Sequence, residues 1–264
     1  MSSRGPRCGP RFSPRRRWSQ VGSLPTQAEL REAFSQWGLP ARIRVDNGVP
    51  WGSDDELPTE LACWLIGLGV GVVFNPPRRP QANGVVERSQ GVAKQWGEPH
   101  TCATAEELQR RMDEMDRRQR ELYPITPDRR SRWQVYPGLA HSGRAYSEEQ
   151  EKDIWDLNRV AEHLAQFVLR RKVDGQGKIS VYNTQRFIGR DRKGQSVYVT
   201  FDPVEMRWVV CDEQGTEIRR CDAPEVSREA IIGLRMCYAV PCRPAAYAEP
   251  VGRGQPATAP EREP

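Results

Sequence analysis

The sequence lacks a hydrophobic run long enough to cross a bilayer. Its longest stretch without a charged or strongly polar residue covers residues 61–74, which include three glycines, whereas a spanning helix needs about 20 apolar residues. No apolar segment or small-residue cleavage site follows the basic N-terminus, so a signal peptide is not indicated. Charged residues make up 28% of the 264 residues, and the mean hydropathy is −0.74. We therefore expect a soluble cytoplasmic protein with no membrane partner.

Closely spaced ligand pairs for a metal ion are also missing. None of the seven cysteines has C-x-x-C spacing, and the three histidines lie far from any pair of cysteines. Structural zinc sites need such pairs, so the sequence argues against a zinc finger. We expect the cysteines to be reduced, as is usual in the cytosol.

Lysine is scarce, and the basic charge is uneven. Only five of the 40 basic residues are lysine. Residues 1–45 carry nine arginines against two acids, a net charge of +7, so the rest of the chain has a net charge of −2. Residues 1–20 predict a disordered basic arm, which either contacts DNA phosphates or has no role. Residues 239–264 contain six prolines and predict a disordered tail.

Residues 21–122 alternate between helix and strand patterns. The segment 26–29 reads T-x-x-E, a capping box that predicts the start of a helix ending at residue 37. Strand patterns and further helix patterns follow in turn. The predicted strands cover 41–45 and 70–74, and the predicted helices cover 58–68, 83–96 and 104–122. This alternation is typical of an α/β layer fold.

The second half of the chain has a different pattern. Residues 123–165 predict a linker that is loop-like to about residue 150 and then helical. Short β-patterned segments separated by Gly-containing turns follow from residue 166. The predicted strands cover 167–172, 178–182, 196–201, 207–211 and 216–219. Such a series of short strands is typical of a small β-barrel, which we place at 166–221.

Two acidic residues occupy positions suited to chemistry. Asp46 ends a predicted strand, and Glu87 lies in the first turn of a predicted helix. A strand's carboxyl end faces the crevice where α/β sheets bind ligands, and the helix dipole favours an ionised first-turn carboxylate. Oxygen ligands of this kind suit Mg²⁺. The alternative is structural, because Asp-Asn-Gly is a common turn former and a first-turn Glu routinely stabilises a helix.

Two stretches of sequence carry a family resemblance. "RVDNGVPWGS" (44–53) and "NPPRRPQANGVVERSQGVAKQW" (75–96) are similar to the second half of the catalytic core of DDE transposases and retroviral-type integrases. That family has Asp-Asn-Gly after its fourth strand and Asn-Gly-x-x-Glu-Arg at its last catalytic helix. "SRWQVYPG" (131–138) resembles the stretch after the core in bacterial insertion-sequence transposases. Residues 166–221 resemble the small C-terminal barrel of these enzymes and of Mu-type transposases.

The resemblance implies a fold, a chemistry and a set of site residues. The fold is an incomplete ribonuclease H-like core, α/β in class, followed by a small SH3-like β-barrel. Asp46 and Glu87, 41 positions apart, correspond to the family's second and third catalytic acids, which bind Mg²⁺ or Mn²⁺ and support DNA cleavage and joining. The residues expected to line the site or contact DNA are Asn47, Asn83, Arg88 and Lys94.

The predicted barrel adds further candidates for DNA contact. Its basic residues form either a phosphate-facing edge or a solvated charged face; they are Arg186, Arg190, Arg192 and Lys193. Its aromatic side chains either stack on bases or fill the barrel core; they are Tyr182, Phe187, Tyr198 and Trp208. The acids at 54–56 are interpreted as N-terminal helix charges rather than metal ligands.

The chain departs from the family at its first catalytic acid. The family places that Asp on its first strand, but Asp46 is the first aspartate of this chain, and no strand pattern precedes residue 21. The expected core therefore lacks its first three strands. In a two-metal site a bridging carboxylate keeps the ions about 3.5–4 Å apart, and the family assigns this bridge to the first Asp. We therefore predict no tight metal binding and no nuclease or strand-transfer activity for this chain alone.

Three functional hypotheses follow from the sequence. The first is a partial or inactive bacterial DDE transposase, with DNA and either a second copy or full-length transposase subunits as partners, and at most a nucleoid association. The second is a non-catalytic remnant that binds DNA or transposase subunits. The third is a pseudogene product without function. The intact pair of Asp46 and Glu87 favours the first hypothesis, and the absent first Asp favours the other two.

Overall fold

A parallel strand pair forms the middle of the molecule. The computed structural model describes residues 22–52, 56–76 and 84–237. Helix α1 (Ser23–Trp37) precedes strand β1 (Arg42–Val45), and helix α2 (Glu60–Gly67) connects β1 to strand β2 (Gly71–Phe74). The strands are parallel, as a helical crossover requires. The predicted order of elements is confirmed here, and our predictions for residues 1–20, 54–55, Asn83 and 239–264 lie outside the described residues.

The capping box predicted at Thr26 is wrong. Helix α1 begins at Ser23, three residues earlier, and Gly22 caps it without a side-chain hydrogen bond. Thr26 lies inside the first turn, where its hydroxyl donates to the Gly22 carbonyl oxygen at 3.0 Å. The start of the helix at 105–121 has a side-chain cap. The Thr104 hydroxyl accepts a hydrogen bond from the Glu107 amide at 3.2 Å, and the Glu107 carboxylate accepts from the amide of Ala103 at 2.9 Å.

The next two helices form a hairpin. Helix α3 (Gly84–Gly97) packs against helix α4 (Ala105–Glu121) across the short 3-10 turn η2 (Pro99–Thr101). The buried Leu108, Met112 and Met115 of α4 make a small apolar cluster with Val92 and Ala93 of α3.

Residues 124–150 are more structured than the predicted loop. They contain helix α5 (Arg132–Val135) and the 3-10 turn η3 (Pro137–Leu139). The signal for α5 is a capping box of the form S-x-x-Q, in which Ser131 and Gln134 exchange side-chain and backbone hydrogen bonds. Further on, helices α6 (Glu151–Ile154) and α7 (Leu157–Leu164) stand where one helix was predicted at 148–165.

The C-terminal part consists of antiparallel strands. The strands are β3 (Leu169–Lys172), β4 (Lys178–Val181), β5 (Thr184–Phe187), β6 (Ser196–Asp202), β7 (Arg207–Cys211) and β8 (Glu217–Asp222). One sheet has the order β3-β6-β7-β8, and β4 and β5 form a separate hairpin. Five of these strands were predicted and β5 was missed. Helix α8 (Arg228–Ile232), also missed, follows the last strand.

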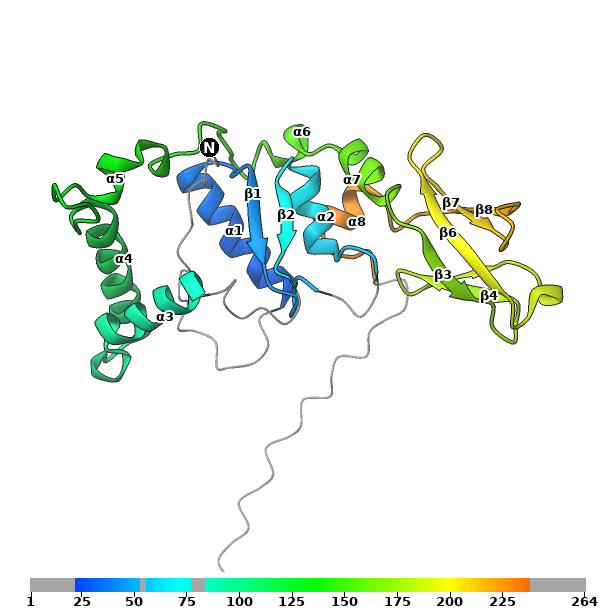
Figure 1. Ribbon diagram of the computed structural model, residues 1–264, viewed down its shortest axis with the longest axis horizontal. Helices are drawn as coiled ribbons and strands as arrows, with labels where there is room; N and C mark the ends of the chain where they lie inside the picture. Colours follow the sequence, from blue (N-terminus) through cyan, green and yellow to red (C-terminus); the bar gives the residue numbers. More distant parts are fainter. Residues whose placement is uncertain (1–21, 53–55, 77–83, 238–264) are drawn as a thin grey trace, which may run out of the picture.

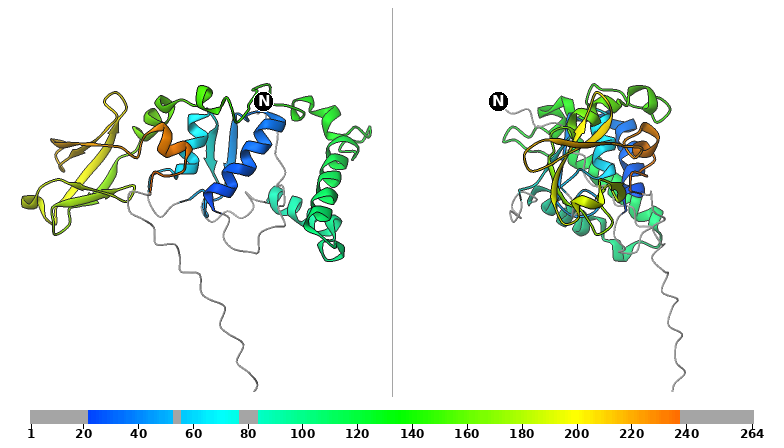
Figure 2. Two further views of the ribbon diagram at one scale, coloured as in Figure 1. Left: turned by 180° about the vertical axis from the view of Figure 1, so that it is seen from behind. Right: turned by 90° about the vertical axis from the view of Figure 1, so that its right-hand side faces the viewer.

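Figure 1 shows these parts in a row. The hairpin of α3 and α4 lies at one end, the β1–β2 pair with α1 and α2 lies in the middle, and strands β3 to β8 lie at the other end. The view from behind in Figure 2 shows the same order. Helix α8 returns to the middle part, where it contacts α2. None of the described helices is long and apolar enough to cross a membrane.

One hydrophobic cluster joins the middle part to the β3–β8 part. It includes Phe34 of α1, Trp64 of α2, Leu164 of α7, Phe201 of β6 and Ile231 of α8, each at most 2% exposed. The cluster therefore draws residues from both sides of residue 166, where the predicted barrel begins.

A glycine makes one close packing contact in this core possible. A Cβ atom placed on Gly67 would lie 2.1 Å from the Trp155 ring. The indole nitrogen of Trp155 donates to the Trp64 carbonyl oxygen at 3.0 Å. Because a side chain at position 67 would displace the Trp155 ring, α2 has to end in glycine here.

Candidate functional site

Asp46 lies at the carboxyl end of β1. Its side chain is exposed, and Oδ1 accepts a hydrogen bond from the Gly48 amide at 3.2 Å. The Gly48 carbonyl oxygen in turn accepts from the amides of Trp51 and Gly52 at 2.9 and 3.0 Å. This local turn directs the Asp46 carboxylate to the surface at the edge where α/β folds bind ligands.

Asn47 connects the ends of the two parallel strands. Its side-chain amide donates to the Asn75 carbonyl oxygen at 3.0 Å. The Asn75 amide also donates to the Val45 carbonyl oxygen at 2.9 Å. Asn47 thus fixes the loop that carries Asp46 against the residue that follows β2, a structural role besides the site-lining role suggested by resemblance.

The residues predicted on the next helix lie in α3. The backbone of Glu87 belongs to that helix, but its side chain is not among the described ones. Arg88 and Lys94 are exposed. Asn83 lies outside the described residues. The predicted pairing of Asp46 with Glu87 therefore stays a prediction.

A metal centre requires several donors in one place. Among the residues that the structure describes, no three His, Cys, Asp or Glu side chains come together in a group suited to a metal ion. A pair of Mg²⁺ ions needs a bridging carboxylate and further acids, and of the two predicted ligands only Asp46 has a described side chain. This donor set does not by itself fit a two-metal site.

Arg186 corrects one expectation about the barrel surface. Its side chain is 4% exposed and forms an ion pair with Glu225, which is equally buried. Its guanidinium also donates to the Val181 and Thr184 carbonyl oxygens at 2.9 and 3.0 Å. The predicted phosphate-facing edge therefore does not include Arg186, because its side chain is buried and ion-paired inside the protein.

Glu225 is the buried residue that sequence analysis missed. It lies beyond the predicted barrel, in a loop before α8, and no local pattern marks it. Its Oε1 accepts hydrogen bonds from Arg186 and, at 2.7 Å, from the Trp208 indole nitrogen. Both partners are buried, and Tyr182 packs against Trp208 with ring centroids 6.2 Å apart. Tyr182 and Trp208 thus belong to the core rather than to a base-stacking surface.

Other predicted barrel residues face solvent. Arg190 and Lys193, in and after the 3-10 turn η4 (Arg190–Arg192), are exposed. Phe187 at the end of β5 is 46% exposed, and the guanidinium carbon of Arg219 lies 5.9 Å from its ring centroid. Tyr198 is half-buried.

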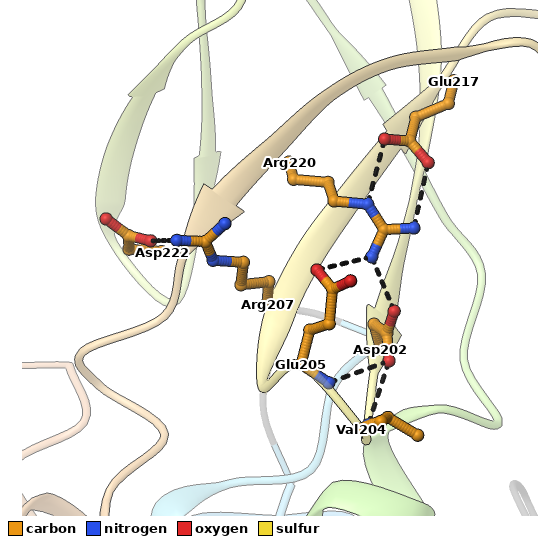
Figure 3. Close-up of polar contacts among 7 residues, drawn as sticks. All are labelled: Asp202, Val204, Glu205, Arg207, Glu217, Arg220 and Asp222. Atoms are coloured by element: carbon orange, nitrogen blue, oxygen red, sulfur yellow. Dashed lines mark hydrogen bonds and ion pairs between the residues drawn. The ribbon is translucent and has the colours of Figure 1, made fainter.

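An ion-paired cluster lies on strands β6, β7 and β8. Figure 3 shows Arg220 between three carboxylates, with nitrogen–oxygen distances of 2.7 Å to Asp202, 2.9 Å to Glu205 and 3.0 Å to Glu217. Beside it, Arg207 lies 3.1 Å from Asp222. The hydrogen bond from Arg220, together with backbone amides, lowers the pKa of Asp202 below its usual range.

The basic residues of this part therefore fall into two groups. Arg207 and Arg220 on β7 and β8 are matched by acids. Arg190, Arg192 and Lys193 around η4 make no ion pair with any described residue. Because a paired guanidinium gains little by exchanging a carboxylate for a phosphate, the η4 region is the better candidate nucleic-acid surface.

A groove of about 450 Å³ lies between α1, α4 and α5. Trp37 and Trp133 line it together with charged residues of α4, and the Arg120 guanidinium stacks over Trp37 at 5.5 Å. None of the predicted site residues lines this groove.

A comparison with protein-family models finds none that matches the chain.

Proposed function

We propose that this chain is a DNA transposition or integration protein of the DDE type, with an incomplete ribonuclease H-like core and an SH3-like barrel. The observation that carries the proposal is the position of Asp46, which is exposed at the carboxyl end of β1 in a parallel strand–helix–strand unit. The Asp-Asn-Gly of this loop and the Asn-Gly-x-x-Glu-Arg before and within α3 are the two motifs of the family. Cutting and joining of DNA phosphodiesters with Mg²⁺ or Mn²⁺ is the activity of the class.

The same proposal includes inactivity of the chain by itself. Asp46 offers one acid, Glu87 is proposed as a second, and no aspartate precedes Asp46 to bridge two ions. Without the bridge, the attacking and leaving oxygens are not stabilised together.

Purified protein incubated with labelled DNA ends and Mg²⁺ or Mn²⁺ tests the inactivity. The expected result is neither cleavage nor joining. Product that disappears in Asp46→Ala would place this chain in the family while disproving its inactivity.

The family assignment itself has a separate test in the DNA just upstream of the Met1 codon. Translation in three frames is expected to yield a hydrophobic strand that carries an Asp. Stop codons or unrelated sequence there would leave the non-catalytic alternative.

That alternative is a remnant that binds DNA or transposase subunits without catalysis. The observation that favours it is the unpaired basic group around η4, compared with the acid-matched arginines in Figure 3. Duplex DNA binding is expected to weaken in Arg190→Ala/Lys193→Ala, and the slope of log K against log salt to fall by about 1 per lost phosphate contact.

Arg207→Ala/Asp222→Ala is the matched control, because it removes one basic residue together with its acid partner. It is expected to bind DNA as the wild type does. Equal losses in both double variants would mean that binding does not depend specifically on the η4 region.

A further inference from the structure

The β4–β5 hairpin has an inner and an outer face. Ile179 lies across the hairpin from Arg186, and both side chains are buried. Because side chains alternate between the faces of a strand, the next pair in the register, Lys178 and Phe187, lies on the outer face. Lys178 is half-buried, and Phe187 is 46% exposed. An exposed apolar ring is not unusual by itself, so its surroundings decide what it can bind.

An arginine from the other sheet lies over the Phe187 ring. The guanidinium carbon of Arg219, on β8, is 5.9 Å from the ring centroid, within the range of a cation–π contact. Arg219 is exposed, and no acid in the described part of the chain forms an ion pair with it. The nearby Glu217 pairs with Arg220 instead, at 3.0 Å. The ring and an unneutralised guanidinium thus lie together at the surface.

More basic residues surround the ring. Lys178 is its direct cross-strand neighbour, and such neighbours have Cβ atoms about 4.5–5.5 Å apart. Residues 190–193 carry three basic side chains and one acid, and none of the three basic side chains pairs with an acid that the structure describes. Asp174 offsets part of the Lys178 charge, because hydrogen bonds from the backbone amides of Lys178 and Gln176 lower its pKa and keep it ionised. The region still has a net positive charge, which suits a phosphate chain.

We propose that Phe187 and Arg219 bind an unpaired base of single-stranded DNA. The base would stack on the exposed part of the phenyl ring, as bases do on aromatic side chains. Arg219 and Lys178 would pair with the flanking phosphates. A duplex does not present such a base, because its bases are paired and stacked on one another. This inference rests on the DNA binding of the proposed function and adds the form of DNA that this part of the chain binds.

A competing explanation is that the two residues only tie the β4–β5 hairpin to β8. A cation–π contact at the surface stabilises a fold modestly, and this role needs no ligand. It predicts that Phe187→Leu unfolds more easily but binds single-stranded DNA as the wild type does. It gives no reason for the basic residues at 178 and 190–193.

The first test titrates the full chain into fluorescein-labelled strands of about 20 nucleotides. One strand contains thymidines, and the other contains abasic sites, which keep the phosphates and lack the bases. Anisotropy is expected to show at least about fivefold tighter binding of the thymidine strand, in line with the usual contribution of one stacked base. Equal binding of the two strands would overturn the proposal.

Variants at position 187 assign the preference to the ring. Phe187→Leu keeps an apolar side chain but has no aromatic face, so the thymidine strand is expected to bind as weakly as the abasic strand. Phe187→Trp is expected to keep the preference, because its larger ring also stacks on bases. Binding of the abasic strand is expected to be unchanged in both variants. A preference that survives in Phe187→Leu would overturn the proposal.

Val204→Ala is the matched control. Val204 is 88% exposed in the turn between β6 and β7, so this variant removes an exposed apolar side chain that has no aromatic face. It is expected to bind both strands as the wild type does. A loss equal to that of Phe187→Leu would show that any exposed apolar side chain has the same effect, and would overturn the proposal.

Arg219→Ala separates the charge from the stacking. It is expected to weaken both strands, and the slope of log K against log salt is expected to fall by about 0.7 for the lost phosphate contact. Unchanged affinity for both strands would remove Arg219 from the site and overturn its assignment.

A cross-link locates the contact even if Phe187→Leu fails to fold. A strand that contains 5-bromodeoxyuridine is irradiated with the wild-type chain, and the attached peptide is identified by mass spectrometry after digestion. Attachment at residue 187 or its neighbours in β4 and β5 is expected. Attachment only to other parts of the chain would overturn the proposal.

A duplex of about 20 base pairs keeps this inference apart from the proposed function. Duplex binding that is lost in Arg190→Ala/Lys193→Ala, with equal binding of the two single strands, would overturn the inference and leave the proposed DNA binding intact. If neither the duplex nor a single strand binds, both are overturned. Binding of a uridine RNA strand without binding of the thymidine strand would assign the site to RNA and overturn the inference.

Discussion

The side-chain amide of Asn47 donates to the carbonyl oxygen of Asn75 across 28 positions of sequence, at 3.0 Å. The bond joins the residues just after the two parallel strands, so it holds the Asp46 loop against β2. Asn47 is exposed and Asn75 is 7% exposed. The position of the Asp46 carboxylate, the candidate catalytic group, thus depends on Asn47, whose side chain has a structural role.

Replacing Asn47 by alanine is expected to lower the free energy of unfolding by about 1 kcal/mol, the usual net value of one intramolecular hydrogen bond. Urea denaturation followed by tryptophan fluorescence measures the loss. Asp46→Ala is the control, and its effect is expected to be within about 0.5 kcal/mol because the side chain is exposed. A larger loss in Asp46→Ala than in Asn47→Ala would contradict this division of roles.

The buried ion pair of Arg186 and Glu225 gives a second prediction. Glu225→Leu leaves the Arg186 charge and the Trp208 indole N–H without their acceptor, so a loss of about 3–5 kcal/mol is expected. Arg186→Met/Glu225→Leu removes both charges and is expected to be more stable than Glu225→Leu alone. Urea denaturation of the single and double variants measures the difference. If the free-energy losses of Arg186→Met and Glu225→Leu simply add in the double variant, the two residues are not coupled.

The pair of Gly67 and Gly91 provides a matched test of packing. A Cβ on Gly67 would lie 2.1 Å from the Trp155 ring, whereas a Cβ on Gly91 in α3 meets nothing within 4 Å. Gly67→Ala is expected to destabilise by about 1–3 kcal/mol. Gly91→Ala is expected to stabilise by about 0.5–1 kcal/mol through helix propensity. Thermal unfolding measures whether the melting temperature falls in Gly67→Ala and rises in Gly91→Ala. Equal shifts in the two variants would argue against the close contact between Gly67 and the Trp155 ring.

Glu151 predicts a loss of stability in acid. Burial raises the pKa of Glu151, but hydrogen bonds from Arg31 and Tyr146 to its carboxylate outweigh this effect and place the pKa below the usual 4.5. A carboxyl group with a lowered folded-state pKa stabilises the fold above its unfolded-state pKa, and this contribution disappears as the pH falls through the folded-state value. The free energy of unfolding is therefore expected to decrease as the pH drops below about 4.5.

Glu151→Gln is expected to be less stable at pH 7 by about 3 kcal/mol and to lose part of this acid dependence. Urea denaturation at pH 7 and at successive steps below pH 4.5 measures both effects. Glu148→Gln is the control, because Glu148 is 66% exposed and lies 3.7 Å from the same arginine. If the Glu148 and Glu151 variants lose the same acid dependence, the buried carboxylate is not its source.

Local sequence patterns predict most helices and strands but not one hairpin. Strand β5 was missed because the turn before it uses Tyr182 and Asn183 with positive φ angles of 48° and 59°. A two-residue turn of this type normally reads Asn-Gly, Asp-Gly or Gly-Gly, and the pair Tyr182-Asn183 matches none of these. Tyr182 is held there by tertiary contacts, since its hydroxyl donates to the Pro58 carbonyl oxygen at 2.8 Å. No window of sequence around residue 182 contains that partner.

The candidate site shows the same limit. The position of Asp46 follows from a strand pattern that ends at an Asp-Asn-Gly turn, so it was predictable. The burial of Arg186 was not, because its partner Glu225 lies 39 positions away, beyond the predicted barrel. From sequence alone, an arginine in a basic segment is interpreted as a phosphate ligand, because the distant acid that pairs with it is visible only in the structure.

The hydrophobic cluster shared by the two halves of the chain constrains how they can be inherited. Tyr182 of the β4–β5 turn reaches Pro58 before α2, and its hydroxyl lies 3.8 Å from the Cys63 sulfur. An exchange of everything after residue 165 between related genes would bring a new turn against an unchanged α2. The new C-terminal half would have to fit the existing surface of α2 and Pro58. We therefore expect the two halves to be inherited together and to change in sequence together.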